Sequence, residues 1–212
     1  MFASVFKWLF IGVLLLTVEV LFVSSVVRQS WVIENIQEEN LKNERVFGEE
    51  TAKHIRQRAD ELYTQWFVNT GLQDSLYKML LPQNDHQAGL DLGAVTDSLF
   101  THVEGSLGTF WAVVYQIITR VQVWWMWLPA AMLLVIPAVI DGVMMRKVKI
   151  VAHITSSSIR LKYATLTIII SLFIMSAALV SPFAVNPLLP LILILSSILM
   201  LSVILANVQK DI

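Results

Sequence analysis

The side chains that most often carry acid-base, nucleophilic or metal chemistry are few and scattered in this sequence. The four histidines are His54, His86, His102 and His153, and no two of them have the i, i+4 spacing of a zinc-binding helix. The absence of cysteine excludes a thiol nucleophile, a thiolate metal site and a disulfide framework. The serines at 156–158 lack a positioned base, which favours a polar loop or a helix cap over a nucleophile. We therefore expect no catalytic residue, no metal site and no cofactor, and a protein that is not an enzyme.

Three ionisable side chains, Glu19, Arg120 and Asp141, lie within long apolar stretches. A charge near the centre of a bilayer costs about 2.5–3.5 kcal/mol on insertion scales, so such residues usually find partners. Glu19 precedes Val27 by eight residues, which places it about 12 Å below the outer end of its helix. If the next helix enters the membrane near Phe110, Arg120 lies about 13–15 Å below the same surface. The two levels agree, which predicts an intramembrane ion pair between Glu19 and Arg120.

The alternative is a membrane boundary at Val121. Arg120 and the "WWMW" of 124–127 would then form an interfacial belt, and Glu19 would meet only water or a partner subunit. In either arrangement a structural role is favoured over catalysis. A proton pathway would need a longer relay of acidic groups, and the last two apolar stretches contain no charge.

The elements that position these residues are membrane helices. A chain of 212 residues with 56% hydrophobic residues and a mean hydropathy of +0.68 is too apolar for an ordinary soluble domain. Roughly 20 apolar residues cross a hydrocarbon core as a helix, and four stretches qualify. They are helix 1 in 1–27, a long helix 2 in 109–145 that extends into the cytoplasm, helix 3 in 164–184, and helix 4 with a short cytoplasmic tail in 185–212. Helix 1 is interpreted as retained, because its apolar run is longer than that of a signal peptide.

Charge sets the orientation of these helices. Residues 146–163 carry five Lys or Arg and no acid, so this loop is predicted to be cytoplasmic. The uncharged connection "SPFAVNP" at 181–187 and residues 28–108 then lie on the periplasmic side, and both termini lie inside. Residues 28–108 contain seven Lys or Arg and thirteen Asp or Glu, an acidic balance poorly suited to nucleic acid. We expect no direct sequence-specific binding of nucleic acid, and any contact with a polyanion or anionic lipid would belong to the basic loop.

Residues 28–108 are predicted to be helical. One apolar face recurs at three- and four-residue steps, formed by Ile55, Ala59, Leu62, Tyr63 and Trp66. Gly71 is expected to end this helix, a short helix follows up to Pro82, and residues 82–93 form an exposed loop. A further helix from about Leu90 runs into helix 2. The predicted fold class is an all-α membrane protein with four transmembrane helices, a small helical periplasmic insertion between helices 1 and 2, and cytoplasmic termini.

Several motifs occur in the order found in a known family. They are Glu19 in helix 1, "WFVNTGLQDSL" at 66–76, Arg120, "IDGVMMRKVK" at 140–149 and "PFAVNP" at 182–187. The most specific are an inner-face motif and a hairpin motif. The inner-face motif consists of Asp141, Gly142, Arg146, Lys147 and Lys149, and the hairpin motif of Pro182, Phe183 and Pro187. Through these motifs the whole chain resembles the inner-membrane protein family of integrating conjugative elements and conjugative plasmids, known mainly as a domain of unknown function.

The resemblance implies a multi-pass protein of the Gram-negative inner membrane that takes part in conjugation. Members are typically encoded beside the coupling-protein ATPase, which implies a non-enzymatic partner or assembly subunit of that ATPase and of type IV secretion components. The lipid bilayer and further copies of the chain in a homo-oligomer are its other expected partners. One departure is that Ser156 and Ser157 stand where the family tends to have Glu-Ser. Two alternatives stay open: a surface-exclusion or regulatory protein, and a small transporter or channel.

Overall fold

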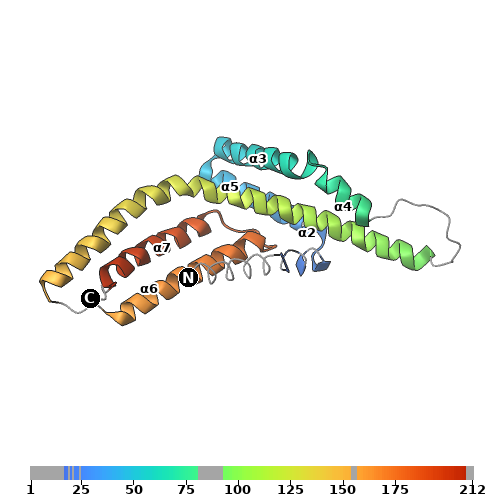
Figure 1. Ribbon diagram of the computed structural model, residues 1–212. Coiled ribbons are helices and arrows are strands. Elements are labelled where there is room, and N and C mark those ends of the chain that lie inside the picture. The colour runs from blue at the N-terminus through green and yellow to red at the C-terminus, as the bar shows by residue number, and fades with distance from the viewer. Residues whose placement is uncertain are drawn as a thin grey trace. The chain divides into compact units, whose positions relative to one another are not determined.

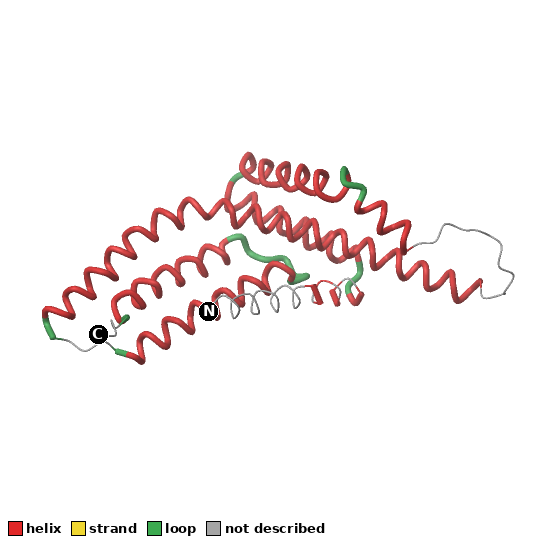
Figure 2. Tube along the Cα trace, in the orientation of Figure 1, coloured by secondary structure: helices red, strands yellow, loops and turns green. Residues whose placement is uncertain are grey.

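All secondary structure in the described part of the chain is helical, as predicted. The structure is a computed structural model that describes residues 17, 18, 20, 22, 23, 25–80, 93–153 and 157–208. Its helices are α2 (Gln29–Phe47), α3 (Glu49–Tyr63), the π-helix η1 (Thr64–Val68), α4 (Leu72–Leu80), α5 (Gly93–Val151), α6 (Ser158–Val180) and α7 (Leu188–Asn207). Figure 1 labels the α-helices, and Figure 2 shows helix and loop without a strand among these residues.

Three of the described helices are long and apolar enough to cross a membrane. They are His102–Val151 within α5, and the whole of α6 and of α7. Most of the predicted helix 1, including Glu19, lies outside the described residues, and so does most of the predicted loop at 82–93.

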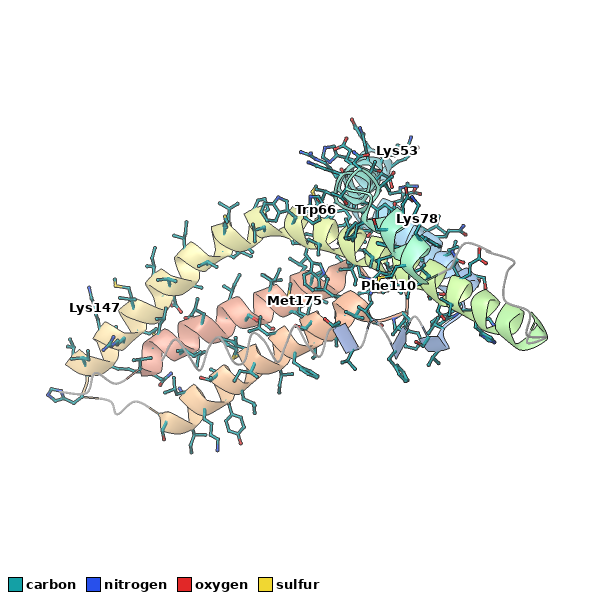
Figure 3. All side chains as sticks on the ribbon, turned by 45° about the vertical axis from the view of Figure 1, so that its right-hand side comes forward. Lys53, Trp66, Lys78, Phe110, Lys147 and Met175 are labelled. Atoms are coloured by element: carbon teal, nitrogen blue, oxygen red, sulfur yellow. The ribbon has the colours of Figure 1, made fainter. Side chains whose placement is uncertain are left out.

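α5 contains the predicted span and, as expected, continues as a helix beyond it at both ends. It begins at Gly93 and ends at Val151, and α6 already begins at Ser158. The basic residues between the predicted spans therefore lie on helices and not in a loop, because Met, Lys and Arg have high helix propensity and permit a helix to continue beyond the lipid. Lys147, for example, lies near the C-terminal end of α5 (Figure 3).

The chain divides into two compact units. Unit 1 comprises Met1–Gln122 and Val180–Val185, and unit 2 comprises Val123–Leu179 and Asn186–Ile212. The N-terminal part of α5 thus belongs to unit 1 together with α2, α3 and α4. The loop that follows α6 also belongs to unit 1 as far as Val185, whereas nearly all of α6 and the whole of α7 belong to unit 2.

Unit 1 has a small apolar core and a tight helical hairpin. One cluster of buried apolar side chains comes from three helical segments and consists of Val23, Val32 and Val113. α2 and α3 are joined at Gly48, whose φ of 83° lies in the left-handed region that glycine adopts without strain. A salt bridge between Arg56 and Glu44 connects the two helices of this hairpin.

The apolar face predicted for α3 is confirmed only up to the π-helix. Ile55 and Ala59 are buried, but Trp66 is 56% exposed. The N–H of Asn69 donates to the carbonyl of Thr64, five residues back, at 2.8 Å. This π-turn is wider than an α-helical turn and rotates Trp66 away from the buried face.

The predicted stop at Gly71 is confirmed. Its φ is 69°, a conformation that suits glycine, and α4 begins at the next residue. α4 runs to Leu80, and the predicted stop at Pro82 lies outside the described residues.

Candidate functional site

Unit 1 contains a buried ion pair between Arg120 on α5 and Glu39 on α2. Each residue is only 4% exposed. Nε of Arg120 donates to Oε1 of Glu39 at 3.0 Å and to Oε2 at 3.3 Å, and Nη2 of Arg120 also donates to Oε1. Charge-assisted hydrogen bonds of this kind are stronger than neutral ones. Burial of both charges is tolerated only when the remaining donors and acceptors also find partners.

Those partners are backbone groups of the loop between α6 and α7. Nη1 of Arg120 donates to the carbonyl of Ser181 at 2.6 Å, and Nη2 donates to the carbonyl of Phe183 at 2.7 Å. In the opposite direction, the N–H of Val185 donates to Oε1 of Glu39 at 2.9 Å. The loop has no regular structure to pair its own backbone groups, so these contacts satisfy three of them.

Other side chains of α2 hold the same loop. Oδ1 of Asn35 accepts from the N–H of Ala184 at 3.1 Å, and Nζ of Lys42 donates to the carbonyl of Ala184 at 3.0 Å. The ring of Trp31 meets Phe183 edge to face, with ring centroids 5.4 Å apart. Steps of three and four residues place these side chains on one face of α2. We call the complete set the loop clamp: Trp31, Asn35, Glu39, Lys42 and Arg120.

Gln116, one turn before Arg120 on α5, completes the surroundings of the carboxylate. Its Nε2 donates to Oε1 of Glu39 at 3.2 Å, while its Oε1 has no hydrogen-bond partner among the described residues. The carboxylate of Glu39 thus accepts from a guanidinium, a side-chain amide and a backbone amide. This arrangement can fix helices and a loop in one position.

The predicted partner of Arg120 was a different acid. Glu19 lies outside the described residues, so the Glu19–Arg120 pair stays a prediction. Glu39 was missed, because the sequence shows only a polar stripe on α2 and the burial of that stripe is known from the structure. Asn35, Glu39 and Asn43 recur at four-residue steps in α2 and are all buried. Buried polar groups require hydrogen-bond partners, so such a stripe indicates a helix face that meets polar groups elsewhere in the chain.

The residues of the hairpin motif divide between the two units. In unit 1, Phe183 packs on Trp31, and Pro182 separates the two loop carbonyls that Arg120 binds. In unit 2, Pro187 is buried and forms the N-cap of α7 with a φ of −63°, which suits the start of a helix. Its carbonyl accepts from the indole Nε1 of Trp127 at 2.9 Å.

In unit 2 the inner-face motif packs on α7. Asp141 accepts a hydrogen bond from Oγ of Ser202 at 2.7 Å. A Cβ at Gly142 would lie 2.8 Å from the backbone oxygen of Ser202, so glycine is what permits α5 and α7 to approach this closely. Lys149 donates to Oδ1 of Asn207 at 2.7 Å at the end of α7, where a cation is favoured by the helix dipole.

The remaining members of the motif, Arg146 and Lys147, form no salt bridge with a residue that the structure describes. Lys147 is exposed, whereas Arg146 is partly buried. The motif therefore has two parts. Asp141, Gly142 and Lys149 contact α7, whereas Arg146 and Lys147 are not engaged in a salt bridge with a described residue.

The residues considered for catalysis or metal binding are not gathered into a site in the described part of the chain. No group of three His, Cys, Asp or Glu side chains there could hold a metal ion, and His86 lies outside it. Oγ of Ser157 accepts from the N–H of Arg160 at 3.3 Å, so this serine serves as the helix cap of α6. Ser156 also lies outside the described residues.

Comparison with known proteins gives one family. No curated protein and no solved structure matches the chain. The family described as "IncC plasmid conjugative DNA transfer protein DtrJ-like" matches residues 24–211, a range that contains the loop clamp, the hairpin motif and the inner-face motif. This match confirms the resemblance to membrane proteins of conjugative elements. The chain belongs to the DtrJ-like family of conjugative DNA transfer proteins.

Proposed function

We propose that this chain is a non-enzymatic subunit of the conjugative DNA transfer apparatus in the Gram-negative inner membrane, where it is a partner of the coupling-protein ATPase of a type IV secretion channel. The observation that carries the proposal is the family match over residues 24–211. The three long apolar helices support a location in a membrane. The loop clamp supports an assembly role, because its buried charges bind the protein's own backbone.

The proposed topology has four spans, cytoplasmic termini and a periplasmic insertion at 28–108. The loop clamp supports it, since Asn35, Glu39 and Lys42 of the insertion contact the loop between α6 and α7. Two segments in direct contact must lie on the same side of a membrane. The positive-inside rule had assigned both segments to the periplasmic side independently.

The same contacts favour a membrane boundary near Val121 over one near Phe110, which extends the proposed periplasmic segment from residue 108 to Arg120. Arg120 binds the loop that follows α6, so it lies level with the outer end of that helix. From Arg120 to Arg146 the helix rises about 39 Å, close to the 40–45 Å of a bilayer with its headgroups. Trp125, which is 66% exposed, then belongs to an aromatic belt at the interface.

Two surfaces suit the proposed partners. The membrane helices expose large apolar side chains, among them Leu133 at 73% and Phe173 at 71%, which can pack against transmembrane helices of the ATPase. The periplasmic insertion carries the acidic excess of the chain and would meet components of the secretion channel. The two contacts together would link the ATPase to the channel.

Deletion and purification test the role. Donor cells without this chain are expected to lose DNA transfer, and the intact chain supplied in trans should restore it. Affinity purification in mild detergent from cells with the complete transfer cluster should recover the coupling-protein ATPase. Recovery of copies of the chain alone would contradict the partnership, and a recipient made newly permissive by the deletion would instead indicate surface exclusion.

Cysteine labelling tests the topology, because the chain has no cysteine of its own. Glu50→Cys should react with a membrane-impermeant maleimide in spheroplasts, whereas Lys147→Cys should react only after permeabilisation. Both residues are exposed, so a difference in labelling would report the side of the membrane. Labelling of Lys147→Cys in intact spheroplasts would overturn the proposed orientation.

A further inference from the structure

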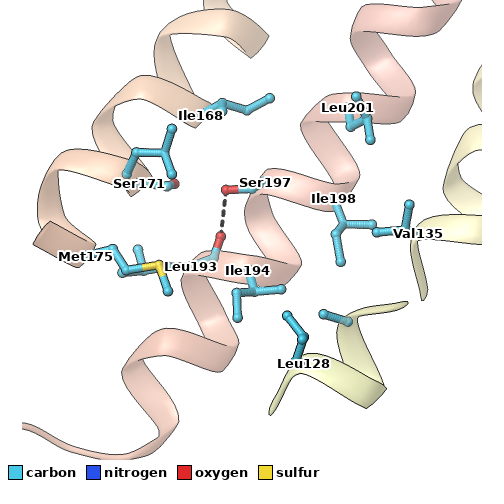
Figure 4. A pocket seen from close by; sticks show the side chains of 12 residues that line it. Leu128, Val135, Ile168, Ser171, Met175, Leu193, Ile194, Ser197, Ile198 and Leu201 are labelled. Atoms are coloured by element: carbon cyan, nitrogen blue, oxygen red, sulfur yellow. Dashed lines mark hydrogen bonds between the residues drawn. The ribbon is translucent and has the colours of Figure 1, made fainter. Parts of the chain in front are cut away.

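Unit 2 contains an apolar pocket among α5, α6 and α7. Its volume is about 470 Å³, and its lining includes Val135 from α5, Met175 from α6 and Ile194 from α7 (Figure 4). Two serines also line the pocket, but their hydroxyls are bound elsewhere. Oγ of Ser171 is 3.2 Å from Oγ of Ser196, and Oγ of Ser197 donates to the carbonyl of Leu193 at 2.8 Å, the bond drawn in Figure 4. The pocket therefore suits a purely hydrocarbon occupant.

Two arginines lie toward the inner ends of the helices that line this pocket. Arg146 follows Val135 by eleven residues on α5, and Arg160 precedes Ser171 by eleven residues on α6. Eleven residues are about three helical turns, so each arginine lies on the same helix face as its pocket residue, about 16 Å away along the axis. Neither arginine forms a salt bridge with a described residue.

These spacings match the dimensions of one lipid leaflet. Half of a hydrocarbon core is about 15 Å, so an acyl chain that reaches the pocket would have its phosphate near the level of both arginines. A transmembrane helix fits less well, since a cylinder of about 10 Å diameter would fill 470 Å³ within about 6 Å of its length. The guanidinium groups provide the charge that complements a phosphodiester.

We propose that unit 2 binds one anionic phospholipid of the inner leaflet, with an acyl chain in the pocket and the phosphate between Arg146 and Arg160. The inference rests on the membrane location proposed above. The lipid would fill a cavity that the side chains of the three helices leave open. Because it binds the folded protein, it would also stabilise the packing of α5, α6 and α7.

Lipid titration of the purified full-length chain tests this proposal. The chain is delipidated in mild detergent and titrated with dioleoyl phosphatidylglycerol or dioleoyl phosphatidylcholine, while native mass spectrometry counts the bound lipids. One phosphatidylglycerol is expected per chain, bound about tenfold more tightly than phosphatidylcholine. Equal binding of the two lipids, or a dimer of the chain that excludes phosphatidylglycerol, would overturn the site.

Matched variants separate the two parts of the site. Arg146→Gln with Arg160→Gln should weaken phosphatidylglycerol binding about tenfold. Lys162→Gln is the control, because nine residues place Lys162 on the face of α6 opposite Ser171. Equal loss with Lys162→Gln would mean general attraction to a basic surface and would overturn the proposal.

A pocket variant keeps all charges. Ala131→Phe fills the pocket that Ala131 lines, and it should reduce the retention of lipid, whereas Ala130→Phe, at a position outside the lining, should not. Fractionation of cells before purification tests the membrane location separately from the lipid site. A membrane-embedded chain without preference for phosphatidylglycerol refutes the lipid site alone, and a chain recovered in the soluble fraction refutes the membrane location itself.

Discussion

The loop clamp predicts that Glu39→Ala destabilises the protein strongly. Truncation leaves the buried guanidinium of Arg120 without its counterion and the N–H of Val185 without its acceptor. Removal of one partner from a buried ion pair costs about 3–5 kcal/mol, because the other charge stays buried and uncompensated. For a chain of this length, such a loss corresponds to a fall in melting temperature of roughly 6–20 °C.

Thermal unfolding in detergent micelles, followed by tryptophan fluorescence, measures this effect. Glu38→Ala is the matched control, since Glu38 is the adjacent residue and its side chain is 57% exposed in a salt bridge to Lys42. An exposed pair contributes about 0–1 kcal/mol, so the control should unfold within a few degrees of the parent. Similar melting temperatures for Glu39→Ala and Glu38→Ala would refute the reasoning.

A charge exchange separates the ion pair from the loop contacts. Glu39→Arg combined with Arg120→Glu restores opposite charges, but a glutamate at 120 cannot donate to the carbonyls of Ser181 and Phe183. We therefore expect only partial recovery of the lost stability. Full recovery would show that the loop contributes little, and rescue of Arg120→Glu by Glu19→Arg would identify Glu19 as a partner.

Three further predictions concern single contacts, each measured as a shift in thermal unfolding. Gly142→Ala should destabilise the protein by about 1–3 kcal/mol, because the added Cβ would meet the backbone of α7. Gly105→Ala, with open space around the added Cβ, should be neutral or stabilising by about 0.5–1 kcal/mol. Equal effects of the two substitutions would contradict the close approach of α5 and α7. Asn207→Ala removes the acceptor shared by a lysine and a backbone amide and should cost about 1–2 kcal/mol, and an unchanged melting temperature would contradict that role. Phe183→Ala and Trp31→Ala should show a coupling of about 0.5–1.5 kcal/mol in a double-mutant cycle, and strict additivity would argue against the ring contact.

The helices could be predicted because their signals are local. Long apolar runs indicated α5, α6 and α7, and Gly71 indicated the end of a helix. Helix ends were predicted less well where no breaker residue occurs, as at the C-terminal end of α5. The exposure of Trp66 could not be predicted. A single π-turn changes the helical register, and no characteristic amino-acid composition marks such a turn in the sequence.

The site depends on contacts between distant parts of the sequence. Glu39 and Arg120 are 81 residues apart, and α2 offers several other acids that could have served equally well by spacing alone. The hairpin motif was recognised as specific. Its residue types do not show, however, that side chains of α2 and α5 bind the backbone of this loop. Backbone carbonyls and amides are the same in every sequence, so the partners of the loop become visible only in the structure.

The buried pair also explains how α2 finds one position on α5. Apolar contacts such as those of Val32 and Val113 depend little on register, because valine packs against many surfaces of similar shape. The pair is different, since a slip of α2 by one helical turn, about 5.4 Å, would separate Glu39 from Arg120 and from Val185 at the same time. Such a slip would leave two buried charges and a loop amide unpaired, at several kcal/mol. We therefore expect the ion pair to contribute less to net stability than to the choice of a single arrangement of helix and loop.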